Sequence, residues 1–220
     1  MQDQIVQEIC QEKVIAIVRG VEPTTCLKVV RALYAGGIRF VEVTFSQKDP
    51  TSFSTTAGLI SSIAEEMAGK MHVGAGTVIT QQQLRLAADA GAKFIISPNT
   101  DPQIISATKE MGLISLPGAL TPSEIVTAYA AGADFVKLFP IAQMGVAYVK
   151  AIRAPISHIP LMAVGGVNET NLKSYLDAGC VGAGIGGNLV NAAWIKAGEF
   201  ERITEVAKQL VEIVRESRAS

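Results

Sequence analysis

Short apolar runs alternate with amphipathic stretches along the chain, and this pattern predicts strands that alternate with helices. Short apolar runs bounded by glycine or proline are typical of parallel strands that are buried on both faces. The predicted strands cover residues 14–18, 38–45, 71–75, 94–97, 113–116, 133–140, 161–164 and 181–185. A leading helix over residues 3–12 precedes the first strand, and the last helical stretch extends to about residue 215.

The ends of the predicted helices carry repeated signals. Ala-Gly pairs end four of them, at residues 35–36, 90–91, 131–132 and 178–179. Thr121-Pro122-Ser123-Glu124 is a capping box with proline in the first turn. Eight strand–helix units without a linker predict one α/β domain over residues 1–220, a (β/α)8 TIM barrel with a short N-terminal helix. An open doubly wound sheet is the alternative, and strands that are apolar throughout favour the barrel.

Composition excludes several classes of partner and site. The net charge is -1 with 5% aromatic residues, and without a basic run there is no case for nucleic acid or a membrane surface as a partner. No apolar run reaches the length of a membrane span. Cys10, Cys26 and Cys180 are isolated from one another and from both histidines, so we expect neither a disulfide framework nor a metal site. With no signal peptide visible, a reducing cytoplasm is the expected location.

One lysine interrupts the apolar run at residues 133–140. Active sites of barrels lie at the C-terminal ends of the strands, and Lys137 is near that end, whereas Lys13 and Lys93 precede their strands. Burial disfavours the ammonium form and lowers the pKa of a lysine from about 10.4. A neutral amine attacks a ketone and forms a Schiff base. The alternative is a lysine with a buried stem and an ammonium that reaches solvent at the rim.

The second predicted strand contains a carboxylate. Alternation puts Phe40, Glu42 and Thr44 on one face. Carboxylates are almost never fully buried without a partner, so Glu42 is either in a structural ion pair with Arg19 or Lys137, or a general acid/base with a raised pKa. We favour the catalytic interpretation, because a lone glutamate and a lone lysine emerge on neighbouring strand ends of one barrel.

Glycine pairs end the seventh and eighth predicted strands, at Gly165-Gly166 and Gly186-Gly187. Phosphate sites in barrels are often built there from loop amides and a helix N-terminus, and glycine lets the backbone approach the anion. Either pair alone is equally compatible with an ordinary turn. Two pairs on these two strands indicate a phosphorylated ligand.

Two more polar residues follow strands at the same end. Arg19 offers a guanidinium to a carboxylate, and Thr77 offers a hydroxyl. A structural role stays open for both, although the strand of Arg19 neighbours the strand of Glu42.

These motifs recur together in one known family. They are Val18-Arg19, Gly36-Gly37, Glu42-Val43-Thr44-Phe45, Gly74-Ala75-Gly76-Thr77-Val78, Ser97-Pro98, Pro117-Gly118, Thr121-Pro122-Ser123-Glu124, Lys137-Leu138-Phe139-Pro140 and Gly165-Gly166-Val167. Over almost its whole length, the chain resembles the bacterial 2-keto-3-deoxy-6-phosphogluconate (KDPG) aldolase / 4-hydroxy-2-oxoglutarate (KHG) aldolase family.

The resemblance implies a class I (Schiff-base) aldolase, a lyase without metal or organic cofactor, commonly a homotrimer. Its small-molecule substrate is a keto-acid sugar phosphate: KDPG is cleaved to pyruvate and glyceraldehyde 3-phosphate, and KHG to pyruvate and glyoxylate. The implied catalytic residues are Lys137 for the Schiff base and Glu42 for proton transfer. The implied substrate-binding residues are Arg19, Thr77, Pro98, Phe139, Gly165, Gly166, Gly186 and Gly187.

Three positions differ from the pattern of many family members. Val164 and Gly187 stand where threonine and serine are common, and Ser46 stands where some members have arginine. The segments 163–167 and 97–99 look like those of relatives that cleave 2-keto-3-deoxy-6-phosphogalactonate (KDPGal), so a KDPGal aldolase is the alternative substrate class. A phosphate-binding barrel isomerase is a further alternative, with Glu42 as base, and a non-catalytic sugar-phosphate binding module ranks last.

Overall fold

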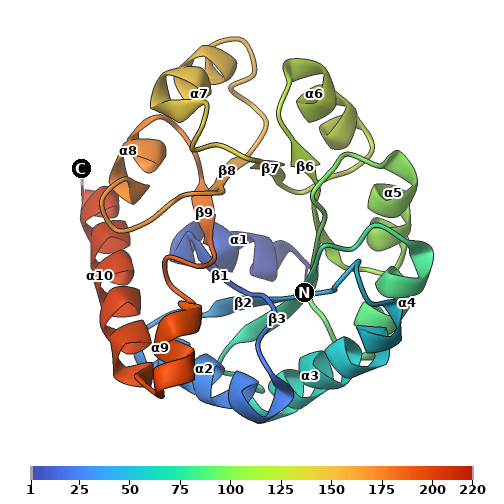
Figure 1. Cartoon of the computed structure of the whole chain (residues 1–220). Coiled ribbons are helices and arrows are strands. Elements are labelled where there is room, and N and C mark those ends of the chain that lie inside the picture. Colours follow the sequence, from blue (N-terminus) through green and yellow to red (C-terminus); the bar gives the residue numbers. More distant parts are fainter. Residues whose placement is uncertain (1, 220) are drawn as a thin grey trace.

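The apolar runs form parallel strands around a barrel, and this confirms the predicted fold class (Figure 1). The computed structural model describes residues 2–219. Neighbouring strands pair in the order β5-β4-β3-β2-β1-β9-β8-β7-β6. The strands are β1 (Val14–Val18), β2 (Phe40–Thr44), β3 (His72–Gly76), β4 (Phe94–Ile96), β5 (Ile114–Leu116), β6 (Gly118–Ala119), β7 (Val136–Leu138), β8 (Leu161–Val164) and β9 (Gly182–Ile185).

The described residues form nine strands where the sequence predicts eight, because the fifth predicted strand continues beyond Pro117. Proline has no N–H to donate, so it interrupts the ladder. β5 pairs with β4, and β6 pairs with β7. The carbonyl of Pro117 between them accepts a hydrogen bond from the Lys137 N–H at 2.9 Å. The two halves of this broken strand therefore join both ends of the strand order and nearly close the barrel.

The helices lie outside the strands, except that α1 lies across one end of the barrel (Figure 1). They are α1 (Gln2–Glu12), α2 (Pro23–Ala35), the 3-10 helix η1 (Pro50–Ser52), α3 (Phe53–Glu66), α4 (Gln81–Asp89), α5 (Pro102–Glu110), α6 (Pro122–Ala130), α7 (Gly145–Arg153), α8 (Leu172–Asp177), α9 (Ala192–Ala197) and α10 (Phe200–Ala219). No helix in the described part of the chain is long and apolar enough to cross a membrane.

Two helix boundaries differ from the expectation. The predicted C-terminal helix is divided into α9 and α10 at Gly198, whose φ of 75° is left-handed. Glycine adopts this conformation without a steric cost, so it stops the helix. The sequence also predicts that Asn168 caps the helix ending at Ala178-Gly179, but the N-cap position of α8 is Asn171. The Asn168 side chain instead accepts a hydrogen bond from the Thr170 N–H at 2.9 Å, in a turn before that helix begins. By contrast, the predicted capping box is confirmed at Thr121, whose hydroxyl accepts from the Glu124 N–H.

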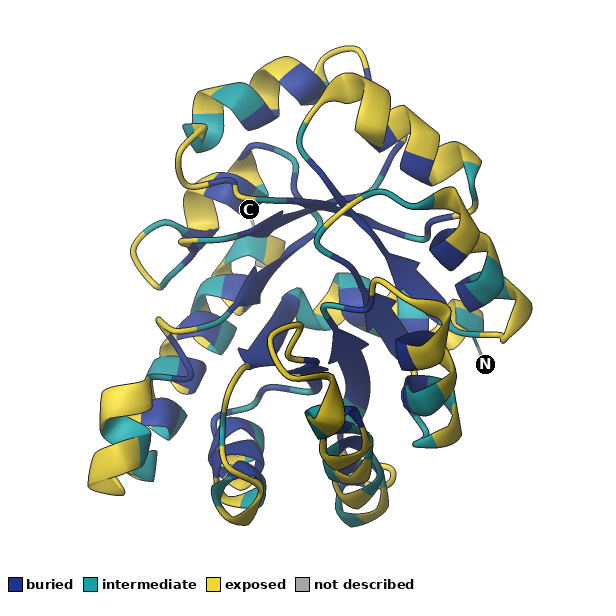
Figure 2. Cartoon of the chain, turned by 45° about the vertical axis from the view of Figure 1, so that its right-hand side comes forward, coloured by how far each residue is buried: buried dark blue, intermediate teal, exposed yellow. Residues whose placement is uncertain are grey.

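Buried apolar side chains form two layers. The outer layer lies between the strands and the surrounding helices, whose outward faces are exposed (Figure 2). The inner layer fills the barrel between the strands and α1, and its members are Ile5, Ile9, Ile15, Phe40, Phe94, Ile96, Ile114, Leu116, Phe135 and Met162. Because α1 packs on the N-terminal end of the barrel, its apolar side chains close the barrel interior at that end.

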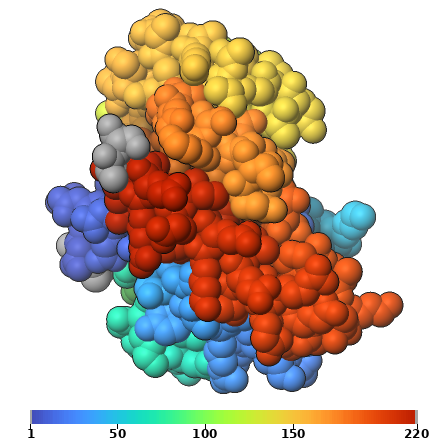
Figure 3. All heavy atoms as spheres, turned by 90° about the vertical axis from the view of Figure 1, so that its left-hand side faces the viewer, coloured from blue at the N-terminus to red at the C-terminus, as the bar shows by residue number. Residues whose placement is uncertain are grey.

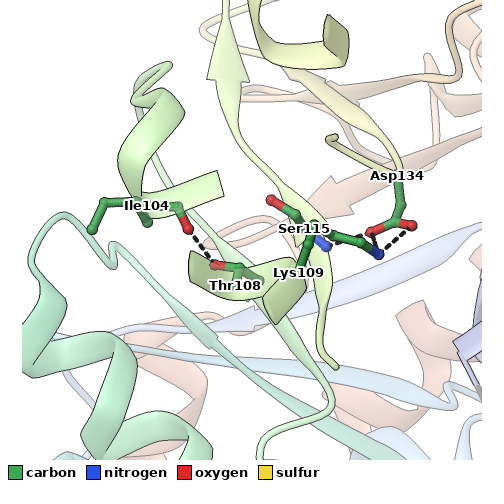
Figure 4. Close-up of polar contacts among 5 residues, drawn as sticks. All are labelled: Ile104, Thr108, Lys109, Ser115 and Asp134. Atoms are coloured by element: carbon green, nitrogen blue, oxygen red, sulfur yellow. Dashed lines mark hydrogen bonds and ion pairs between the residues drawn. The ribbon is translucent and has the colours of Figure 1, made fainter. Parts of the chain in front are cut away.

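Polar contacts lie beside the broken strand (Figure 4). Lys109 on α5 contacts both carboxylate oxygens of Asp134 at 2.7 Å. Asp134 also accepts a hydrogen bond from the Ser115 N–H at 2.8 Å. On the same helix, the hydroxyl of the fully buried Thr108 donates to the Ile104 carbonyl at 2.7 Å. These contacts connect α5 and β5 to the segment that enters β7.

The last helix lies beside one of the first, which closes the outer ring. α10 packs along α8 and α2 (Figure 3). The Thr204 hydroxyl donates to the Ala32 carbonyl at 2.9 Å. A Cβ at Gly36 would lie 2.3 Å from the Cβ of Ala207, so only glycine permits this close approach.

Candidate active site

Lys137 and Glu42 line one narrow cavity inside the barrel, with a volume of about 10 Å³, which is close to the space of one water molecule. Lys137 lies on β7 and Glu42 on β2, and β1, β9 and β8 separate these strands. The two strands are therefore not neighbours, and the two side chains approach each other through the barrel interior. Lys137 is only 5% exposed, so the alternative of an ammonium that reaches solvent at the rim is wrong.

Glu42 is 1% exposed, and neither of its carboxylate oxygens has a hydrogen-bond partner among residues 2–219. The structural ion pair with Arg19 or Lys137 is not formed among these residues either. Leaving a buried acceptor unsatisfied is costly. The environment of Glu42 is therefore typical of a functional carboxylate rather than of a structural one.

Burial displaces both groups toward their uncharged forms. Desolvation raises the pKa of the Glu42 carboxyl above its ordinary value, and the charges of Lys137 and Arg19 only partly oppose this. Desolvation likewise lowers the pKa of the Lys137 amine; the charge of Glu42 opposes this shift, and that of Arg19 adds to it. A neutral amine beside a neutral acid is the combination that begins imine formation.

Two glycines of β3 make room for this site, a role that the motifs in the sequence do not assign to them. A Cβ at Gly76 would lie 1.6 Å from Oε1 of Glu42, so the carboxylate occupies the space above this residue. A Cβ at Gly74 would lie 2.3 Å from the ring of Phe94. Two glycines at alternate positions of one strand are the signal in the sequence, because glycine within a strand marks a close approach.

Phe139 lies between the amine and the first glycine pair. The Lys137 Nζ lies over the Phe139 ring, 4.8 Å from its centroid. A Cβ at Gly165 would lie 3.3 Å from the same ring. Phe139 therefore contacts both predicted parts of the site, and its bond to Pro140 is a cis peptide.

Arg19 and Thr77 line one cavity of about 570 Å³ with Thr44. It lies beyond the C-terminal ends of β1, β2 and β3. Arg19 is exposed and also lines a neighbouring cavity of about 380 Å³ with Lys196 of α9. The structure thus brings the two predicted polar residues together at the predicted end of the barrel.

The two glycine pairs differ in how strictly their positions require glycine. Gly165 and Gly166 have φ values of 95° and 81°, which other residues rarely adopt. Gly187 is exposed, and a Cβ added there would have nothing within 4 Å, so space does not demand glycine at this position. The Asn188 amide donates to the Val167 carbonyl at 3.0 Å and ties the two loops together. Loop residues separate both pairs from the short helices α8 and α9, so loop amides, rather than helix N-termini, adjoin the glycines.

The remaining candidates are Pro98, the cysteines and groups of side chains that could bind a metal. Pro98 packs on the backbone of Gly118, where a Cβ would lie 2.4 Å from the Pro98 carbonyl. Burial raises the pKa of the Cys26 and Cys180 thiols to about 11 and about 12, so neither is an effective nucleophile. Within residues 2–219, no group of three or more His, Cys, Asp or Glu side chains is arranged to hold a metal ion.

Comparison with known proteins shows the family of this chain. A family model described as KDPG and KHG aldolase matches residues 5–206. A 2-dehydro-3-deoxy-6-phosphogalactonate aldolase of Escherichia coli (strain K12) is 35% identical over 204 residues, which cover 92% of this chain and 95% of that protein. A KHG/KDPG aldolase of the same organism is 36% identical over 186 residues, 83% of either protein.

A solved structure agrees with these matches. The KDPG aldolase from Legionella pneumophila, with pyruvate captured at low pH as a covalent carbinolamine intermediate, superimposes with a TM-score of 0.83 at 28% identity. The match covers 93% of this chain and 97% of that chain. The chain therefore belongs to the KDPG and KHG aldolase family and is an aldolase of the lyase class.

Proposed function

We propose that this aldolase uses Lys137 to form a Schiff base with the C2 ketone of a 2-keto-3-deoxy-6-phospho sugar acid, and Glu42 to transfer protons. The observation that carries the proposal is the buried lysine and the buried, unpaired glutamate that share one cavity. The same cavity is otherwise lined by apolar side chains, so water competes poorly for the reacting atoms.

Imine formation uses the uncharged forms of both residues. The Lys137 amine attacks C2, and a carbinolamine forms. The Glu42 carboxylic acid donates its proton to the C2 hydroxyl, which leaves as water. The products of this step are a protonated imine on Lys137 and a carboxylate on Glu42, so Glu42 is ready to act as a base.

Cleavage then follows from the positive charge on the imine. The Glu42 carboxylate removes the proton of the C4 hydroxyl, the C3–C4 bond breaks, and its electron pair moves to the iminium nitrogen. Glyceraldehyde 3-phosphate leaves, and an enamine remains on Lys137. The enamine takes a proton at C3, and water hydrolyses the imine to release pyruvate and the free amine.

The two ends of the substrate have separate binding regions in this proposal. The keto-acid carboxylate lies towards Arg19 and Thr77, where a guanidinium and a hydroxyl line one cavity. The phosphate lies at the loops of Gly165-Gly166 and Gly186-Gly187. Pro98 and Phe139 complete the walls between them.

KDPG and its galactonate epimer are the two candidate substrates, with KHG as the unphosphorylated one. The galactonate epimer is supported by the E. coli phosphogalactonate aldolase, which is similar over most of its length. It is also supported by Val164, which lines the cavity of Lys137 where a threonine would add a hydroxyl. A side-by-side assay of pyruvate release from the three substrates decides between them.

A single catalytic domain, a homotrimer and a cytoplasmic location also belong to this proposal. Exposed apolar side chains on and beside α5 and α6, at Met111, Val126 and Tyr129, offer a surface for contact between copies. Light scattering of the purified protein measures the mass, and a monomeric mass would reject the trimer.

Trapping of the imine tests the chemistry. Borohydride added with pyruvate should reduce the imine and leave a stable adduct on Lys137, detected by mass spectrometry of the intact protein and its peptides. Lys137→Met should form no adduct, whereas Lys93→Met, at an exposed lysine that precedes β4, should match the wild type. An equal adduct on Lys137→Met would reject the assignment, and turnover without any adduct would favour the isomerase-like use of Glu42 alone.

A further inference from the structure

Thr77 is held in an unusual backbone conformation beside the proposed carboxylate site. Its φ is 58°, and Lys13 is the only other non-glycine residue with a positive φ among those described. A β-branched residue rarely adopts this region. Such a strained conformation persists only where neighbouring groups hold it. Thr77 also lines the cavity that contains Arg19.

One such neighbouring group is Gln47, in the loop that follows β2. The Gln47 side-chain amide donates a hydrogen bond to the Thr77 carbonyl at 2.8 Å. This bond joins the loop after β2 to the turn after β3, and both loops line the same cavity.

Gln47 is itself oriented by Gln83, a fully buried residue of α4. The Oε1 of Gln83 accepts from the N–H groups of Ile79 and Thr80 at 2.9 and 3.2 Å. Its Nε2 donates to Oε1 of Gln47 at 3.1 Å. The N–H groups of Ile79 and Thr80 fix the orientation of the Gln83 amide. The Gln83 amide in turn donates to Oε1 of Gln47, so Nε2 of Gln47 points to the Thr77 carbonyl.

We propose that Gln47 is a positioning residue of the aldol reaction, which acts through Thr77 by fixing the Thr77 hydroxyl for the carboxylate of the keto acid. This rests on the proposed function, because it assigns the carboxylate to the cavity of Arg19 and Thr77. Among residues 2–219 no hydrogen bond involves the Thr77 hydroxyl, so it remains available to a ligand.

The effect of Gln47 falls on binding of the keto acid rather than on bond cleavage. Lys137 and Glu42 lie in the inner cavity, which neither Gln47 nor Thr77 lines. Loss of the Gln47 amide donor allows Thr77 to leave its left-handed conformation. The keto-acid carboxylate then loses its hydrogen bond from the Thr77 hydroxyl. The KM therefore changes, whereas kcat, which depends on the buried pair, does not.

Gln47→Met tests the proposal, since methionine keeps the length of the side chain and removes the amide donor. Gln47 is exposed, so the variant is expected to fold, and its Tm verifies this. The pyruvate concentration that gives half-maximal borohydride trapping should rise about fivefold to tenfold, which is the loss of about one hydrogen bond. The maximal adduct and kcat should stay within about twofold of the wild type. Gln82→Ala, at an exposed glutamine next to Gln83, is the matched control and should change nothing.

The same substitution in a Thr77→Gly protein distinguishes an effect of Gln47 through Thr77 from a general effect on the loop after β2. In Thr77→Gly the hydroxyl is absent and a positive φ costs nothing, so adding Gln47→Met should raise the half-maximal concentration by less than about twofold. An equal rise in both backgrounds, or no rise in Gln47→Met alone, overturns the proposal. Failure of the proposed function gives a different result, because the wild type itself would then form no pyruvate adduct.

Discussion

Burial has two opposed consequences for Lys137. The desolvation that lowers its pKa and makes the amine nucleophilic also removes favourable hydration, so the residue weakens the fold that contains it. Glu42 has the same property, with two carboxylate oxygens that no described group satisfies. In the proposed site, the burial that costs stability is therefore also what would make the two groups reactive.

Lys137→Met should stabilise the protein and abolish the trapped adduct. Methionine fills a similar volume without a charge, and removing the cost of burying a polar group is worth about 1–3 kcal/mol. The Tm of a chain of this length shifts by about 2–4 °C per kcal/mol, so we expect a rise of several degrees by calorimetry. Lys93→Met, at an exposed position, should leave the Tm unchanged. A lower Tm for Lys137→Met would contradict the cost assigned to the buried amine.

Glu42→Gln should lower kcat by about 10²–10⁴-fold and change how stability depends on pH. The pKa of Glu42 is raised in the folded state from the ordinary 4.5. The free energy that its protonation adds to folding is therefore present below pH 4.5 and is lost as the pH rises through the raised value. Glutamine does not titrate, so the variant should gain stability over the wild type as the pH increases.

Urea unfolding of the Glu42→Gln and wild-type proteins over a series of pH values measures this difference. The other carboxylates contribute equally to both proteins and cancel. A difference that is constant with pH would show that the pKa of Glu42 is the same in the folded and unfolded proteins, and would contradict the raised pKa.

At the scale of elements, β3 is the strand that gives the site its room. It contributes no side chain at Gly74 and Gly76, and the side chains of Phe94 and Glu42 occupy the space. The adjacent β2 can therefore carry a carboxylate inside the barrel without widening it.

Gly76→Ala should destabilise the protein by about 1–3 kcal/mol and reduce kcat, because its methyl would displace Glu42. Gly58→Ala is the matched control: it lies within α3, with nothing within 4 Å of the added methyl. Alanine is the better helix former, so this control should stabilise by about 1 kcal/mol. Urea unfolding of both variants, with kcat measured in parallel, checks the pair. Equal stability of Gly76→Ala and the wild type would show that Glu42 moves aside freely.

The whole molecule is a barrel with one closed end and one open end. α1 packs Ile5 and Ile9 against the inner apolar layer at the N-terminal end, and the loops that line the cavity of Arg19 and Thr77 lie at the other end. Stability and chemistry are therefore largely separated along the barrel axis.

Ile9→Ala should test this separation. Ile9 is 1% exposed, and loss of a large aliphatic side chain from a core costs about 2–5 kcal/mol. The folded protein should still trap pyruvate as well as the wild type, because Ile9 lies far along the barrel from the strand ends. Gln7→Ala, on the exposed side of α1, should leave the urea midpoint unchanged. A proportional loss of trapping in folded Ile9→Ala would show that the two ends are coupled.

The sequence by itself determined the order of strands and helices, the barrel and the end of it at which the site is proposed. It could do so because apolar runs, Ala-Gly pairs and capping boxes such as Thr121–Glu124 are local signals. Those local signals also placed Lys137 within a buried strand, and the motifs around it indicated the family that the comparisons support.

Only the tertiary structure decided which side chains share a space. β2 and β7 are not neighbours, so no local sequence pattern shows that Glu42 and Lys137 line one cavity. Nor does a local pattern show that the Glu42 carboxylate occupies the space where a side chain at Gly76 would lie. The link from Gln83 through Gln47 to Thr77 joins three separate segments and has no periodicity to reveal it. Burial, hydrogen-bond partners and pKa shifts depend on such long-range neighbours, and the folded chain alone brings them together.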